Sequence, residues 1–250
     1  MTALIDALQA REGIVCAVGA GGKKSVLYQL AREHRGRFAL TATVHTTVFP
    51  DDLGLHSVID DDTNLRQRLR AADPDRSVAY ACPSGKPGRH AGASPATIRA
   101  IHDEGGFDAT FVKADGARMR WIKAPAPDEP IVVPGADLVI PVVSARALGE
   151  PLGERVAHRV DRVAAVAGVA PGEVLTPEAV GRLLASERGA LYRAAGGRVA
   201  PVINMVDNDD KEELARAAAA AAIALTSRFD RVVLCCLRRP ERPVVAVVTR

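Results

Sequence analysis

Short apolar runs alternate with segments of helical periodicity along most of the chain. A continuous apolar run bounded by glycine or polar residues is typical of a strand that is buried on both faces of a parallel sheet. Such runs predict strands at residues 14–18, 38–44, 78–81, 109–112, 137–143, 199–203, 232–237 and 244–248. Between them, the spacing of apolar positions predicts helices at residues 2–9, 25–33, 64–72, 95–102, 154–166, 176–184 and 211–225.

The alternation of strands and helices predicts an α/β fold. Strands joined through helices form right-handed crossovers, and these give a mostly parallel sheet flanked by helices. The 250 residues fit one such domain, residues 1–250, and a change of composition near residues 149–153 indicates a helical insertion at residues 154–197.

A glycine-rich turn follows the first predicted strand and opens a helix. It consists of Gly19, Ala20, Gly21, Gly22, Lys23, Lys24 and Ser25. Glycines allow a sharp turn with close approach to phosphate oxygens, and the amides and dipole of a helix N-terminus favour an anion. Lys23 would then contact the β- and γ-phosphates and Ser25 would coordinate Mg²⁺. We therefore expect a P-loop NTPase-like fold that binds a nucleoside triphosphate, ATP or GTP, at these residues.

The turn departs from the usual G-x-x-x-x-G-K-[ST] spacing. It is shorter, Lys24 stands where Ser or Thr is usual, and Ser25 comes one position late. The alternative is a structural strand-to-helix turn with its lysines in solvent. A third reading, a dinucleotide-binding turn, fits less well because Gly19, Gly21 and Gly22 do not follow G-x-G-x-x-G.

Charged residues follow the strand predicted at residues 109–112. Asp115 comes at the point where strand ends converge on the ligand crevice of an α/β sheet, so we expect it beside Lys23 and near Mg²⁺. Arg118 and Lys123 follow and are candidates to clamp phosphate or an anionic substrate. The alternative for Asp115-Gly116 is an ordinary turn.

Asn204 and Asp207 end a later strand. GTP-binding proteins use N-K-x-D at such a place, with the Asp reading guanine, although Met205 replaces the Lys here. The segment therefore predicts base recognition, and the alternative is a helix N-cap region.

Composition and charge restrict the class of protein. The net charge is +3 with both signs interspersed, which favours a small-molecule ligand over a nucleic acid. The sequence shows neither a signal peptide nor an apolar run of about 20 residues, as a membrane span requires. Its four cysteines lack metal-type spacing. We expect a cytoplasmic protein.

Together these motifs resemble the YqeC-type family of selenium-cofactor biosynthesis proteins. The motifs that carry the resemblance are the turn at residues 19–23, Thr47, Pro50, residues 114–117, residues 123–125, Glu129-Pro130, Gly149, Pro151, His158-Arg159, Asn204 and Asp207. The resemblance implies a nucleotide-binding accessory role in the maturation of selenium-dependent molybdenum hydroxylases, with such an enzyme or its cofactor as partner. Lys24 stands where the family has Thr, and Lys113 where it has Glu.

Two hypotheses about function follow. In the first, the protein is an NTP-dependent enzyme in which Lys23, Asp115, Arg118 and Lys123 are catalytic and Ser25 and Asp115 hold Mg²⁺. In the second, it is a non-hydrolysing carrier or insertion chaperone for a phosphate-bearing pterin or nucleotide. Lys24 and Lys113 motivate the second, because both add positive charge where a metal ion is expected.

Overall fold

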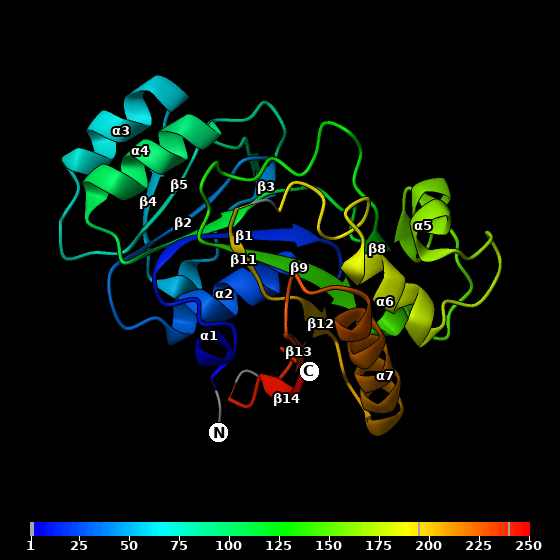
Figure 1. The fold of residues 1–250 in the computed structure, drawn as a ribbon. Coiled ribbons are helices and arrows are strands. Elements are labelled where there is room, and N and C mark those ends of the chain that lie inside the picture. The colour runs from blue at the N-terminus through cyan, green and yellow to red at the C-terminus, as the bar shows by residue number, and fades with distance from the viewer. Residues whose placement is uncertain (1–2, 195, 240) are drawn as a thin grey trace.

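The predicted mostly parallel sheet is present in the computed structural model, which describes residues 3–194, 196–239 and 241–250. Its strands run in the order β14-β13-β12-β9-β1-β7-β2-β5-β4, with β11 paired to β9 (Figure 1). The strands are β1 (Gly13–Gly19), β2 (Phe38–Ala42), β4 (His56–Ile59), β5 (Val78–Ala81), β7 (Ala109–Lys113), β9 (Leu138–Ser144), β11 (Arg198–Val199), β12 (Val202–Asn204), β13 (Arg231–Cys235) and β14 (Val244–Thr249). Within this sheet, β14 is antiparallel to β13 and the other described pairings are parallel.

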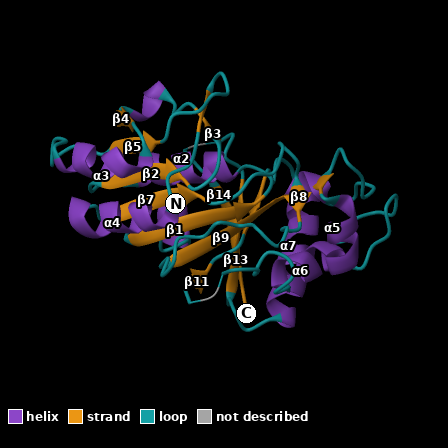
Figure 2. Ribbon diagram, turned by 90° about the horizontal axis from the view of Figure 1, so that it is seen from above, coloured by secondary structure: helices purple, strands orange, loops and turns teal. Residues whose placement is uncertain are grey.

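Helices cover both faces of the sheet (Figures 1 and 2). They are α1 (Leu4–Ala7), α2 (Lys23–Glu33), α3 (Asp62–Arg70), α4 (Pro95–Gly105), α5 (Val160–Ala167), α6 (Pro177–Ala185) and α7 (Asp209–Leu225), with 3₁₀ turns η1 (Asp51–Leu53) and η2 (Ala145–Ala147). Successive strand side chains point to opposite faces. Ile14 and Cys16 therefore pack in the core with α3–α7, while Val15 and Ala17 pack in the core with α1 and α2. The α/β class with a mostly parallel, helix-flanked sheet is confirmed.

The region from residue 154 differs from the prediction. The helix expected at residues 154–166 begins only at Val160, because β10 (Ala157–His158) pairs with β8 (Ile122–Lys123) in a separate two-stranded sheet. His158 therefore lies in a strand, and Arg159 precedes the helix with a positive φ of 67°. A further small sheet joins β3 (Thr46–Thr47) to β6 (Arg89–His90). The helix expected at residues 2–9 spans Leu4–Ala7; residues 1 and 2 lie outside the described part.

The strand order brings the three predicted site segments, those after β1, β7 and β12, to one edge of the sheet. β1 lies between β7 and β9, and β12 lies beyond β9. All four are parallel, so the turns that follow them meet at the same edge. Among the described helices, none is long and apolar enough to cross a membrane.

Candidate functional site

The glycine turn between β1 and α2 is held by its packing. Gly19, Gly21 and Gly22 have φ values of 88°, 81° and 113°, a region that side chains disfavour. A Cβ at Gly22 would collide with the side-chain amide of Asn204, and one at Gly19 would collide with the β9 backbone. The glycines therefore serve the packing of the turn, with or without a ligand.

The amides of the turn divide into two groups. The first three donate hydrogen bonds inside the protein, from Gly19 to Asp115 Oδ2 (2.9 Å), from Ala20 to the Val142 carbonyl (2.8 Å) and from Gly21 to the Arg120 carbonyl (3.0 Å). The next four, of residues 22–25, have no acceptor among the described residues. The amides that are available to donate to an anion are therefore those of residues 22–25, at the N-terminus of α2. The amides of residues 19–21, at the start of the glycine turn, are not available.

Lys23 and Asp115 lie together at the end of β1 and β7. Lys23 is 6% exposed and Asp115 is 1% exposed. Lys23 Nζ lies 2.8 Å from Asp115 Oδ1 and also donates to the carbonyl of Gly19. Burial lowers the pKa of Lys23, and the Asp115 charge opposes that shift. The structure thus brings together the two residues that the strand-end argument expects to be neighbours.

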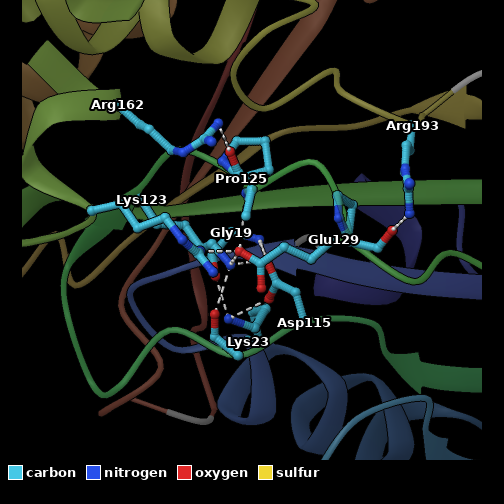
Figure 3. Close-up of polar contacts among 12 residues, drawn as sticks. Gly19, Lys23, Asp115, Lys123, Pro125, Glu129, Arg162 and Arg193 are labelled. Carbon is cyan, nitrogen blue, oxygen red and sulfur yellow. Dashed lines mark hydrogen bonds and ion pairs between the residues drawn. The ribbon is translucent and has the colours of Figure 1, made fainter. Parts of the chain in front are cut away.

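Lys123 extends this pair into a chain of alternating charges (Figure 3). Its Nζ lies 3.1 Å from Asp115 Oδ2 and 2.6 Å from Glu129 Oε1, and it donates to the Gly116 carbonyl at 2.6 Å. Glu129 also pairs with Arg159. Three cations thus face two carboxylates from Lys23 to Arg159, and each carboxylate pairs with two of the cations.

The turn that carries Glu129 is tied to the region of the predicted insertion. Arg162 of α5 donates to the Pro125 carbonyl at 3.2 Å (Figure 3), and Arg193 donates to the Pro127 carbonyl at 2.6 Å. Because Glu129 holds Lys123, these contacts also fix the geometry around Asp115.

Within the described part of the chain, Arg118, Lys24 and Lys113 form no ion pair with this chain of charges. Arg118 is exposed and lines a separate pocket of about 560 Å³ beside His158. Lys24 Nζ donates to Thr47 Oγ1 at 2.9 Å, and Lys113 Nζ donates to a backbone carbonyl at 2.6 Å. Burial and the Lys23 charge lower the pKa of Lys113 to about 8. Neither of these two lysines pairs with Asp115.

The two predicted Mg²⁺ ligands line different cavities. Ser25 is exposed and lines a pocket with Asn204 and Asp207, whereas Asp115 lines a small internal cavity with Lys123. Within the described part of the chain, no cluster of three or more His, Cys, Asp or Glu side chains is placed to hold a metal ion. The Asp115 carboxylate is surrounded by two lysine ammonium groups and a backbone amide, so it is placed to pair with lysine rather than to bind a metal ion.

The pocket beside Ser25 has a volume of about 190 Å³ and contains the predicted base-reading residues. Asn204 Nδ2 donates to the Gly21 carbonyl at 2.9 Å, so this residue supports the glycine turn. Asp207 Oδ2 accepts from Arg146 at 2.7 Å. The segment leads directly into the N-cap of α7, Asn208, whose side chain accepts from the Lys211 amide, as the alternative of a helix N-cap region expects.

Sequence reasoning missed Arg146 and gave Glu129 and Arg159 no role. Arg146 follows β9, which is parallel to β12 and ends beside it. A charged residue directly after a predicted parallel strand was the signal that could have identified it. Glu129 and Arg159 appeared only as parts of the family motifs. Their pairing depends on β8 and β10, whose two-residue lengths leave no periodicity to detect.

Comparison with known proteins agrees with the resemblance seen in the motifs. The model of the family described as YqeC protein matches residues 15–161, which include the glycine turn, Asp115, Lys123, Glu129 and Arg159. A relative named Uncharacterized protein YqeC, from Escherichia coli (strain K12), is 27% identical over 191 residues, 76% of this chain and 74% of that protein. The match to the family model covers more than half of the chain, and the chain belongs to the YqeC family.

Proposed function

We propose that this protein binds the phosphates of a nucleoside triphosphate at the N-terminus of α2. The observation that carries the proposal is the set of free amides at residues 22–25, which open an 11-residue helix directly after a buried strand. Lys23 stands at the same point with its ammonium group 2.8 Å from Asp115. Free amides, a helix dipole and a lysine together form an anion site of the kind that cradles phosphate.

Lys23 has to exchange partners when phosphate binds. In the structure its Nζ is engaged by Asp115 and by Gly19, so contact with a phosphate oxygen replaces one ion pair by another. Asp115 keeps Lys123 at 3.1 Å and therefore does not become an unpaired buried charge. Lys123 therefore keeps the free-energy cost of this exchange of partners low.

The base is proposed to occupy the pocket beside Ser25. The ion pair with Arg146 takes Asp207 Oδ2, while Oδ1 is contacted only weakly, by the Cys236 thiol at 3.5 Å, within the described part of the chain. A guanine edge would use that second oxygen. Preference for GTP over ATP is the corresponding expectation.

A second candidate is nucleotide or cofactor binding without Mg²⁺ or hydrolysis. It is favoured by the pairing of Asp115 with both Lys23 and Lys123, because a carboxylate that already faces two ammonium groups is a poor ligand for Mg²⁺. A protein of this kind would act as a carrier or insertion chaperone. The sequence resemblance suggests a molybdenum hydroxylase as the recipient, and normal hydroxylase maturation in a deletion strain would remove that role.

Isothermal titration of ATP, GTP and CTP, with and without Mg²⁺, tests both candidates. Charge-assisted hydrogen bonds contribute about 1.5–3 kcal/mol, so Lys23→Ala should weaken binding roughly tenfold to a hundredfold. Lys24→Ala is the matched control, because its Nζ is directed to Thr47. Binding that requires Mg²⁺ supports the NTP-dependent enzyme, and binding without it supports the carrier. Failure of all three nucleotides to bind wild-type protein refutes the proposal.

A further inference from the structure

A second pocket lies on the other side of the charged chain, at α5. Its volume is about 380 Å³, and it is formed by residues 125–127, one face of α5 and the segment that carries Arg188 and Tyr192. This volume is within the range of small-molecule sites, about 300–1,000 Å³. It contains no residue of the glycine turn, so it is separate from the proposed nucleotide site.

The lining combines an apolar wall with a small number of charges. Pro125, Pro127, Ala165, Val166 and Tyr192 provide apolar surface, as in sites that hold an organic body. The charged lining groups are two arginines and one aspartate, which gives a net charge of +1.

The two arginines have hydrogen-bonding capacity to spare. The Arg188 guanidinium has no hydrogen bond or ion pair among the described residues, and Arg162 donates once, to the Pro125 carbonyl. A guanidinium has five N–H donors in a planar fork that matches carboxylate and phosphate. The remaining charged group, Asp161, is exposed, as both arginines are, and the three together leave one positive charge in excess.

This pocket adjoins the chain of charges. A smaller cavity of about 20 Å³, enough for about one water molecule, is lined by Gly19, Asp115 and Lys123. Pro125 and Tyr192 line both cavities, so they form the wall between them. Figure 3 shows Arg162 directed to the carbonyl of Pro125.

We propose that the pocket at α5 binds a second small-molecule substrate with an apolar body and an anionic group, phosphate or carboxylate. Arg188 and Arg162 pair with the anion, and Tyr192 with the two prolines holds the body. The molecule thus lies against the wall behind which Asp115 and Lys123 are buried, across from the proposed nucleotide. The pocket does not depend on the nucleotide proposal, because it shares no residue with the amides of residues 22–25.

Calorimetric titration with phenyl phosphate, benzoate and inorganic phosphate tests this inference. We expect saturable binding of phenyl phosphate or benzoate, and the tighter of the two identifies the anionic group. Loss of one charge-assisted contact in Arg188→Ala should weaken it roughly tenfold to a hundredfold. Arg35→Ala is the matched control, an exposed arginine without a partner among the described residues that precedes β2 at the opposite edge of the sheet. Circular dichroism checks that each variant is folded.

Lys23→Ala separates this site from the nucleotide site. Unchanged binding of the aromatic anions in Lys23→Ala, even if nucleotides fail to bind, supports the pocket at α5. Loss of binding in Lys23→Ala but not in Arg188→Ala would place the anion at α2 and overturn the inference. It is also overturned if neither aromatic anion saturates at millimolar concentration, or if inorganic phosphate binds Lys23→Ala as tightly as the aromatic anions do.

Discussion

The substitution Asp115→Asn removes the charge that balances two buried lysines. Asp115 Oδ1 faces Lys23 at 2.8 Å and Oδ2 faces Lys123 at 3.1 Å, and all three side chains are at most 6% exposed. Oδ2 also accepts from the Gly19 amide at 2.9 Å. Asparagine can keep one of these acceptor contacts, but it supplies no negative charge.

The expected loss of stability depends on which ion-pair partners Lys23 and Lys123 retain in the variant. Removing one partner of a buried ion pair costs about 3–5 kcal/mol. Lys123 retains Glu129 at 2.6 Å, whereas Lys23 loses its carboxylate, so we expect a loss near the lower end, about 3 kcal/mol at pH 7. Without Asp115 the pKa of Lys23 falls further below its unfolded value. The unfolded variant then binds more protons than the folded one, so the deficit shrinks as the pH rises toward the ordinary lysine pKa.

Urea denaturation followed by circular dichroism, repeated at several pH values, measures this effect. Asp52→Asn is the matched control, because Asp52 pairs with Arg32 at 2.7 Å on the surface and such pairs contribute about 0–1 kcal/mol. A loss below about 1 kcal/mol for Asp115→Asn, or a deficit that grows with pH, would refute the account of a buried ion pair.

Three further predictions concern the turn and two titrating groups. Gly22→Ala should cost more than Gly54→Ala in thermal denaturation: each forces a side chain to positive φ, about 1–2 kcal/mol, but only at Gly22 does the Cβ collide, with Asn204. The amine of Lys113 should titrate near pH 8 by ¹³C NMR, and stability should rise between about pH 8 and 10.5, a slope that Lys113→Met should remove. Burial and nearby cations lower the pKa of His158 to about 4, so stability should fall from pH 6.5 to 4, less steeply in His158→Gln when urea midpoints are compared.

The sequence could predict the features that depend only on the local pattern of apolar residues and on the order of the strands along the chain. Apolar runs identified the sheet, and the parallel arrangement implied that the turn after β1 and Asp115 meet at one edge. The structure shows β1 and β7 as direct neighbours. Both inferences need only chain order and the rule for strand ends.

The contacts around Asp115 could not be read from the sequence. Whether a lysine faces a metal, a phosphate or a carboxylate depends on the tertiary fold. Lys123 reaches Asp115 from β8, and Glu129 reaches Lys123 from the proline-containing turn that follows. The same holds for Asp207, whose partner Arg146 is 61 positions away. Helical periodicity was also misleading before Val160, because pairing of β10 with β8 overrides the local preference there.

The three internal hydrogen bonds of the glycine turn have a consequence for the entropy of ligand binding. Gly19, Ala20 and Gly21 are each tied to a different part of the chain, so the backbone of the turn is ordered before a ligand arrives. A ligand at the neighbouring amides then loses little affinity to the ordering of a flexible loop. The glycines of this turn therefore do not make it flexible. They allow the positive φ values at which the turn packs tightly against its neighbours.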